Sequence, residues 1–599
     1  MPNESQTTAS LLSAAIGLHK AGNLAAAQAE YARVLEQEPN NAEALYLSGA
    51  VDYQTGALEG AAAKLAKSLA ARAGHLPAIE MLGAVSVKRG QFDEAARCFE
   101  MAALQKPTAH ETHYNHGFAL FNLGAYAQAA DALRKALALK AGYAPALYLY
   151  AVVLRLNRQL PEAAAVYGEV VKSQPENIPA LDEYGGVLYE LGQFGRAEAI
   201  LHQAIFAAPH RANPYTNLGR MFQSDPARAA EALALHERAI ARDPNNAEAH
   251  NNRGVTLYSL GRFHEAVTSC RQAIVLKPTL AEAHHNLAQA LLTVGDMASG
   301  WIAYEWRWKC HSWKTPPRHF TQPTWTGEDL GGKRLLVWGE QGIGDELLQG
   351  SMVADLAERG MNIAWETEPR LVPLIKRSYP NVHVVARTTP PDEATQDPSI
   401  GAQISALSLG RYVRTDIASF PKRSGYLKAD PVRTAAYRKS LLSAGKTKVI
   451  GVSWISTNAD AGKQKSSALK SWAPIWKAAG KAAHFVDLQY SNTTAERAGA
   501  KLDLTHLAEP DLLNDLDGLA ALIAACDVVV TVSNTTAHMA GALGVPVYVM
   551  IPGGSAKLWY WGADEGPSLW YPSAQIFRQP RPNAWDDVIA RVAERIAGA

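Results

Sequence analysis

The sequence predicts an all-α repeat superhelix followed by an α/β region with two lobes of the kind that bind nucleotides. The first half repeats with a period of 34 residues, whereas strand and helix signals alternate after Arg334. Turns rich in glycine or hydroxyl residues follow two of the predicted strands, and ligands of parallel sheets bind at such carboxyl-end turns.

The composition and net charge of the chain argue against several classes of protein. The chain has 599 residues, 48% of them hydrophobic, and a net charge of +1, so we expect neither nucleic acid nor an anionic membrane as a partner. Four cysteines lie far apart without a C-x-x-C pair, which favours a reducing compartment and argues against a zinc site. The N-terminus lacks a signal-peptide pattern and no run of 18 apolar residues occurs, so a cytoplasmic protein is expected.

The repeat signal rests on positions 34 residues apart. A small residue recurs at Ala15, Gly49, Gly83, Gly117, Ala151, Gly185, Gly219, Gly254 and Ala288, with one residue inserted near Asp225-Pro226. A glycine that ends the first helix of a unit follows at Gly22, Gly56, Gly90, Gly124, Gly192, Gly261 and Gly295. This is the tetratricopeptide pattern, with nine units over residues 8 to about 310, and we assign residues 1–310 to the superhelix.

Asparagines recur two positions before the small residue. They are Asn115, Asn217, Asn252 and Asn286, the last three in consecutive units. An asparagine amide can donate to and accept from an extended peptide at once, so these residues are predicted to bind a protein acceptor. The pattern resembles the asparagine ladder of O-GlcNAc transferase. The alternative is that each amide satisfies neighbouring helix groups.

An aromatic segment joins the two halves. Trp301, Tyr304 and Trp308 have helical spacing, which predicts one shared face that packs against the next domain. Residues 311–333 contain three prolines and are expected to form an extended connector.

The two lobes are predicted over residues 334–430 and 431–599. The expected first-lobe elements are strand 334–338, helix 346–358, strand 362–367, helix 370–378, strand 382–386 and a helix-like stretch 401–413. The expected second-lobe elements are strand 448–454, a polar loop 456–470, helix 471–479, strand 484–489, helix 515–525, strand 527–532, a helix up to Gly544, strand 545–551 and helix 584–597.

Two turns are the candidate ligand sites. In GEQGIGDE after the first strand, Gly342 and Gly344 let the backbone approach a donor, although a merely tight connection is an equal alternative. In SNTTAH after strand 527–532, the hydroxyls of Ser533, Thr535 and Thr536 open a helix, although an ordinary helix cap would look the same. Lys463 and Lys465, in the polar loop, are predicted to close on an anionic group, or else belong to a solvated surface.

Together GEQGIGDE, YLKAD, VIGVSW and DVVVTVSNTTAHMAGALGVPV resemble the heptosyltransferase-like, family-nine glycosyltransferases. The WIAYEWRW junction is similar to that of bacterial fusions of tetratricopeptide arrays to such a domain, among them flagellin glycosyltransferases. The resemblance implies a GT-B fold and an inverting sugar transfer without a metal or other cofactor. It also implies a nonulosonic acid such as pseudaminic acid, carried as a CMP nucleotide sugar, and flagellin as the protein partner.

The resemblance assigns roles to residues of both turns. His538 stands at the position of the family's helix histidine. Ser533-Asn534 replaces the family's usual Asp-Thr, which removes a carboxylate beside the donor phosphate, so we hypothesise that Asn534 favours a negatively charged sugar. Asp345 matches the acid of the family's Gly-Asp turn and is the predicted base, with Glu340 and Glu346 as reserves. Its alternative role is to cap the helix.

The sequence is also compatible with two other functions. The lobes could transfer sugar to a saccharide or lipid, with the repeats used for assembly. Alternatively, the chain could be a scaffold without activity, because Ser533-Asn534 departs from the family pattern.

Overall fold

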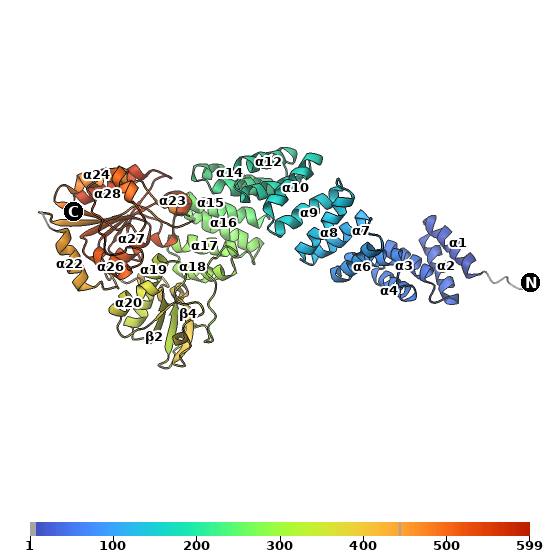
Figure 1. Ribbon diagram of the computed structural model, residues 1–599, viewed down its shortest axis with the longest axis horizontal. Helices are drawn as coiled ribbons and strands as arrows, with labels where there is room; N and C mark the ends of the chain where they lie inside the picture. Colours follow the sequence, from blue (N-terminus) through green and yellow to red (C-terminus); the bar gives the residue numbers. More distant parts are fainter. Residues whose placement is uncertain (1–6, 443–444, 460, 599) are drawn as a thin grey trace, which may run out of the picture. The chain divides into compact units, whose positions relative to one another are not determined.

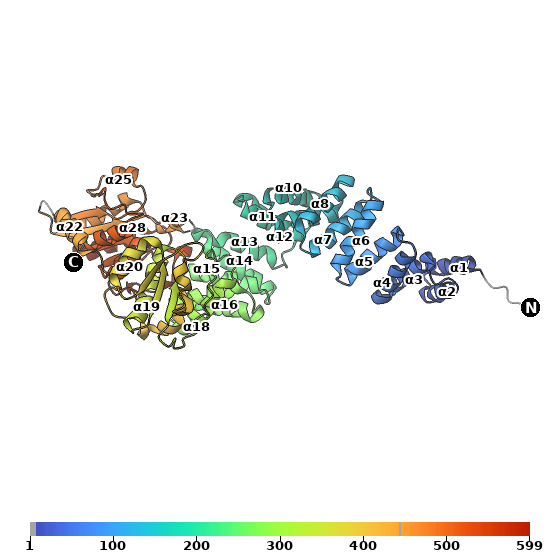
Figure 2. The same cartoon turned by 60° about the horizontal axis from the view of Figure 1, so that its bottom comes forward.

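The computed structural model describes residues 7–442, 445–459 and 461–598 and divides the chain into two compact units, Met1–Asn217 and Leu218–Ala599. Figures 1 and 2 show paired helices along the first part of the chain, and strands flanked by helices in its second part. The boundary between the units lies within the repeat array, so the last repeats belong to the same compact unit as the strands.

Paired antiparallel helices confirm the predicted repeats, and the described residues contain nine such pairs. The first unit holds α1 (Thr8–Lys20), α2 (Leu24–Gln37), α3 (Ala42–Thr55), α4 (Leu58–Ala71), α5 (Leu76–Lys88), α6 (Phe92–Gln105), α7 (His110–Asn122), α8 (Tyr126–Leu139), α9 (Ala144–Leu156), α10 (Leu160–Ser173), α11 (Ile178–Glu190) and α12 (Phe194–Ala207). The boundary falls in α13 (Asn213–Gln223), and α14 (Ala229–Arg242), α15 (Ala247–Ser259), α16 (Phe263–Leu276), α17 (Ala281–Val294) and α18 (Met297–Tyr304) follow.

The helix-ending glycines have the conformation that the pattern predicts. All seven have positive φ values, from +69° to +90°. In the fifth unit Arg158 takes this left-handed position with φ of +62°, although a non-glycine residue is strained there. The one-residue insertion is accommodated by a short 3₁₀ turn, Pro226–Arg228, before α14.

The first lobe is built on a four-stranded parallel sheet in the order β3-β2-β1-β4. Its strands are β1 (Arg334–Trp338), β2 (Ile363–Thr367), β3 (His383–Ala386) and β4 (Ile400–Ser405), and its helices are α19 (Ile343–Glu358), α20 (Val372–Ser378) and α21 (Gly410–Val413). The predicted helix-like stretch 401–413 is therefore wrong in its first part. Ile400, Ala402 and Ile404 alternate with less apolar residues and are buried, which is the strand period.

The second lobe is built on a six-stranded sheet in the order β6-β5-β7-β8-β10-β9, parallel except for the β9–β10 pair. Its strands are β5 (Lys448–Ser453), β6 (Ala483–Asp487), β7 (Val528–Val532), β8 (Val547–Ile551), β9 (Gly566–Pro567) and β10 (Ala574–Arg578). Its helices are α22 (Pro431–Leu441), α23 (Gly462–Lys465), α24 (Ala473–Ala479), α25 (Thr494–Ala500), α26 (Leu516–Ala524), α27 (Thr535–Leu543) and α28 (Trp585–Ala597).

Each sheet contains a point where the strand order reverses. In the first sheet β1 has β2 on one side and β4 on the other, and in the second sheet β5 lies between β6 and β7. Such switch points are where open α/β sheets leave a place for ligands beyond the strand ends. Helix α19 follows β1 and helix α27 follows β7, so both helices begin at these points.

The aromatic junction packs against both lobes, as its helical spacing predicts. Trp301 is 1% exposed and its indole nitrogen donates to the carbonyl of Arg414, 2.9 Å away, in the first lobe. Its ring also lies 5.4 Å, centroid to centroid, from that of Trp559 in the second lobe. The connector adds to the first sheet at β4, where Trp325 N donates to Gln403 O at 2.8 Å.

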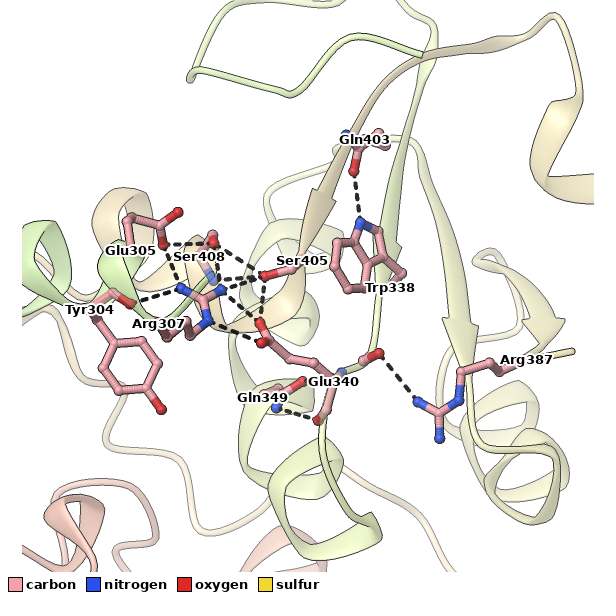
Figure 3. A network of polar contacts seen from close by, with 11 residues as sticks. Tyr304, Glu305, Arg307, Trp338, Glu340, Gln349, Arg387, Gln403, Ser405 and Ser408 are labelled. Carbon is pink, nitrogen blue, oxygen red and sulfur yellow. Dashed lines mark hydrogen bonds and ion pairs between the residues drawn. The ribbon is translucent and has the colours of Figure 1, made fainter. Parts of the chain in front are cut away.

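A buried ion pair fixes the junction to the carboxyl end of β1 (Figure 3). The Arg307 guanidinium donates to both carboxylate oxygens of Glu340, at 3.0 and 2.8 Å, and both side chains are 0% exposed. Hydrogen bonds to the hydroxyls of Ser405 and Ser408, each 2.9 Å long, complete the network. Glu340 thus anchors the start of the glycine-rich turn.

Replacing Arg307 with alanine should destabilise the second unit by about 3–5 kcal/mol, because it leaves the Glu340 carboxylate buried without its counter-ion. Urea unfolding followed by tryptophan fluorescence measures this directly, since all 14 tryptophans lie at or beyond Trp301. The control is Arg262→Ala, which removes an exposed pair with Glu265 and should change little. An Arg307→Ala chain as stable as this control would contradict the anchoring role.

Candidate functional site

The two turns singled out by the sequence meet in the structure. A Cβ atom added to Gly344, in the first turn of α19, would lie 3.1 Å from Cδ2 of His538 and 3.7 Å from Cα of Thr535. The first residue of α27 is Thr535, so the amino ends of the two helices are in direct contact. Each helix amino end carries a positive partial charge, which favours an anion.

Asp345 lies at the third position of α19. Its carboxylate accepts a hydrogen bond from the backbone N–H of Gly342 at 3.3 Å, which is the geometry of a helix cap. The side chain is half-buried, and burial raises the pKa of Asp345 from 3.8 to about 6. The Gly342 hydrogen bond and the positive charge of Lys465 oppose this rise in pKa, whereas Glu340 and Glu346 add to it. The carboxylate is therefore more basic than an ordinary aspartate.

The predicted basic loop contributes one of its lysines. Lys465, the last residue of α23, is 6% exposed, and burial lowers its pKa while the charge of Asp345 raises it. Lys463 and Lys470 are exposed. Around Lys465 the loop is folded on itself, because the Ser466 hydroxyl donates to Gly462 O at 2.7 Å and accepts from Ser456 N at 3.0 Å.

Asn534 caps α27 and ties it to β5. Its Oδ1 accepts from the backbone N–H groups of Thr536 and Ala537 at 3.0 and 3.4 Å. Its Nδ2 donates to Ser453 Oγ at 2.8 Å and to Ile455 O at 3.0 Å. An aspartate could make the cap but could not donate to these two oxygens. The amide at residue 534 therefore has a structural role at the second switch point.

The hydroxyls of the SNTTAH turn differ in exposure. Ser533 is buried and accepts a hydrogen bond from the Trp561 indole nitrogen at 2.9 Å. Thr536 is fully buried, and its hydroxyl lies 3.5 Å from Leu488 O. Thr535, at the helix start, remains partly exposed, so its hydroxyl is the one of the three that a ligand can reach.

His538 lies behind this helix start in an aromatic enclosure. It is 2% exposed, its ring centroid is 5.1 Å from those of Tyr560 and Trp561, and its Nδ1 lies 3.0 Å from the Tyr571 hydroxyl. Burial lowers the pKa of His538 to about 3, so the ring is neutral at physiological pH. Trp559, Tyr560 and Trp561 are all buried, so they pack in the core around His538.

The two reserve carboxylates already have cationic partners. Glu340 is paired with Arg307, as described above. Glu346 is 4% exposed, is paired with Arg387, and accepts from Thr367 Oγ1 at 2.8 Å and Glu368 N at 2.9 Å. Of these three acids, Asp345 alone has a partly exposed side chain and no arginine beside it in the described contacts.

The four repeat asparagines, Asn115, Asn217, Asn252 and Asn286, are all half-buried. Asn217 Nδ2 donates to Asp182 Oδ1 at 2.7 Å, and Asn286 Nδ2 donates to Asn251 Oδ1 at 2.9 Å. Each of these two bonds reaches a side chain of the preceding repeat. Neighbouring helix groups therefore take up one amide hydrogen in each case, as the alternative interpretation anticipates.

The described residues contain neither a candidate metal site nor a candidate membrane span. Among them, no group of three or more histidine, cysteine, aspartate or glutamate side chains is arranged to hold a metal ion. In the same part of the chain, none of the helices combines the length and apolar character needed to cross a bilayer.

Comparison with known proteins confirms the tetratricopeptide repeats and finds one curated relative that matches most of the chain. Family profiles described as tetratricopeptide repeat match residues 12–75, 81–144, 119–178 and 247–280. Protein FlbA of Caulobacter vibrioides is 30% identical over 498 residues, which cover 78% of this chain and 81% of FlbA.

Two solved tetratricopeptide repeat proteins match parts of the chain. A tetratricopeptide repeat protein from Parabacteroides merdae is 16% identical and covers 42% of this chain and 100% of its own, with a TM-score of 0.30. YrrB, described as a TPR protein with an unusual peptide-binding site, is 24% identical and covers 32% of this chain and 98% of its own, with a TM-score of 0.27.

The raised pKa of Asp345 predicts that its ionised carboxylate lowers the free energy of unfolding. Because its pKa in the folded chain exceeds the unfolded value of 3.8, ionisation penalises folding, and stability falls as the pH rises from about 4 to 6. Asp345→Asn keeps the cap acceptor and should stabilise the second unit above pH 6 by on the order of 1–3 kcal/mol. Thermal unfolding of both chains between pH 4 and pH 8 measures the difference.

Asp397→Asn serves as the control with the opposite sign. Hydrogen bonds from Ser399 lower the pKa of Asp397, so its charge stabilises the folded state above the unfolded pKa and this substitution should reduce stability at neutral pH. If the stability difference between wild type and Asp345→Asn did not change with pH, the claim that burial raises the pKa of Asp345 would be wrong.

Proposed function

We propose that this chain, which belongs to the family of Caulobacter vibrioides FlbA, is a protein O-glycosyltransferase guided by its tetratricopeptide repeats. The proposal of sugar transfer rests on the resemblance of GEQGIGDE, VIGVSW and SNTTAH to family-nine glycosyltransferases. The repeats capture flagellin, and the lobes, as a GT-B enzyme, transfer a nonulosonic acid such as pseudaminic acid from its CMP form to a serine or threonine. The resemblance to flagellin glycosyltransferases such as FlmG suggests both substrates.

The observation that carries the proposal is the meeting of α19 and α27 at Gly344 and His538. It brings a basic carboxylate, two helix amino ends and the buried Lys465 to one place. A nucleotide sugar needs this combination: a base for the acceptor and positive groups for the departing phosphate.

The proposed reaction is a single displacement. The acceptor hydroxyl oxygen attacks the anomeric carbon while Asp345 takes the hydroxyl proton, and a bond between oxygen and the anomeric carbon forms. The bond from the anomeric carbon to the phosphate oxygen breaks, and CMP leaves with the electron pair. The amino end of α27, Lys465 and the Thr535 hydroxyl stabilise the negative charge that develops on the phosphate. With a pKa of about 6, Asp345 is mostly ionised at pH 7 and still basic enough to accept the proton.

Charge supports an acidic sugar as the donor. A CMP-linked nonulosonic acid carries both a phosphate and a carboxylate, so a further carboxylate beside them would repel it. Asn534 supplies the helix cap without a negative charge. Since its amide also donates to Ser453 and Ile455, Asn534→Asp would change the local structure as well as the charge.

Capture of a polypeptide is the role proposed for the repeats. Tetratricopeptide arrays offer concave surfaces for extended segments. Asn217 and Asn286 each use one amide hydrogen within the array, and an amide has a second hydrogen and a carbonyl oxygen with which to bind a backbone.

Sugar transfer is tested with purified chain, CMP-pseudaminic acid and unmodified flagellin, and with mass spectrometry of the flagellin. The wild-type chain should add the sugar mass, and Asp345→Asn should reduce kcat by about 10²–10⁴, since general-base catalysis contributes that much. Asp586→Asn, an exposed aspartate in the first turn of α28, is the matched control and should keep full activity. Transfer at the wild-type rate by Asp345→Asn would rule out this base.

Acceptor capture is tested by replacing Asn217, Asn252 and Asn286 together with alanine. Each lost hydrogen bond costs about 1 kcal/mol, so the Kd for flagellin should rise at least about tenfold while CMP binding is unchanged. Asn122→Ala, an exposed asparagine on α7, is the control. Calorimetry that gives the same Kd for the triple variant and the control would discard the ladder.

A further inference from the structure

The Tyr571 hydroxyl and the His538 ring form a buried pair behind the amino end of α27. Tyr571 is 1% exposed and its Oη lies 3.0 Å from His538 Nδ1. Tyr571 lies after β9, in the turn before β10, and it comes 33 residues after the histidine. The sequence pattern assigns this tyrosine no role.

The fold makes room for Tyr571 inside the helix that carries His538. Gly541 lies one turn after His538 in α27, and a Cβ added there would be 2.4 Å from Cγ of Tyr571. A glycine within a helix lowers helix stability by about 1 kcal/mol relative to alanine. Gly541 accepts this loss of stability because a larger residue would collide with Tyr571. The backbone of Tyr571 is fixed by a hydrogen bond, because its carbonyl oxygen accepts from Ala574 N at 2.8 Å.

The direction of the hydrogen bond between Tyr571 and His538 follows from which atoms of each side chain can donate and accept. Within the described part of the chain, His538 Nδ1 is the one partner of the Tyr571 hydroxyl. A buried hydroxyl donates where it can, and burial raises the pKa of Tyr571 far above 10, so its proton stays in place. Neutral imidazole has one donor and one acceptor nitrogen. If Nδ1 accepts from the tyrosine, the ring proton is on Nε2.

The orientation of the ring is fixed as well. Trp561 lies beside the His538 ring with 31° between the planes, and Tyr560 meets it edge-on with 70° between the planes. Trp561 is itself held by its bond to Ser533, and Gly344 lies against the Cδ2–Nε2 edge of the histidine. The protonated edge therefore faces the place where α19 and α27 begin.

We propose that Tyr571 is a positioning residue that holds His538 in the Nε2–H tautomer, so that His538 offers a neutral N–H donor to the phosphate of a nucleotide bound at the amino ends of α19 and α27. This inference rests on the proposed function. A neutral donor binds the phosphate oxygen without transferring a proton to it, and it adds no charge beside the buried Lys465.

The tautomer is read directly by nitrogen NMR of the full chain labelled with ¹⁵N-histidine, with the His538 signals assigned from their loss in His538→Gln. We expect the chemical shift of an unprotonated nitrogen at Nδ1 and of a protonated nitrogen at Nε2, and a further shift of Nε2 when CMP is added. In Tyr571→Phe, which keeps the ring, the Nδ1 signal should move because its hydrogen bond is gone, and the affinity for CMP should fall about five- to tenfold.

Tyr548→Phe is the matched control, because it removes the same atom from another tyrosine of the same lobe, on β8. It should leave the His538 signals and CMP binding unchanged. A proton on Nδ1 in the wild-type chain, or a Tyr571→Phe chain with unchanged His538 signals or unchanged CMP affinity, would overturn the proposal. These readouts do not depend on sugar transfer, so a chain that binds CMP with the expected tautomer but modifies no flagellin would refute the proposed function alone.

Discussion

The contact between Gly344 and His538 is the constraint on which the rest of the second unit depends. It joins the amino ends of two helices that begin at the switch points of two separate sheets. A Cβ at residue 344 would lie 3.1 Å from the histidine ring, so the ring or the helix end would have to shift by a few tenths of an ångström. The absence of a side chain there lets one lobe contribute a carboxylate and the other a set of backbone N–H groups to the same small volume.

Buried charges in this unit fall into two classes. Arg307–Glu340 and Arg387–Glu346 are ion pairs, closed by further hydrogen bonds, and they fix the ends of the first sheet. Asp345 and Lys465 are coupled by charge, yet burial disfavours the charged form of each, which raises the pKa of the acid and lowers that of the base. Groups whose charged forms are destabilised in this way are typical of sites that await a ligand.

The sequence anticipated the repeats well because their small residues, glycines and helix lengths recur at fixed spacing. It also placed both turns, since each follows an apolar strand. It misread β4, where Ile400, Ala402 and Ile404 were too few to separate a strand from a helix. It could not rank Lys463 against Lys465, because their difference in burial arises from the fold of their loop. Tyr571 was missed because it meets His538 only through tertiary packing.

The most direct test of a shared anion site between the two lobes is hydrogen exchange of the full-length chain with and without CMP. We expect peptides covering residues 341–346 and 533–538 to become protected together on addition of the nucleotide, since both helix ends contact one phosphate. Protection of only one of these segments, or protection elsewhere with both unchanged, would contradict it.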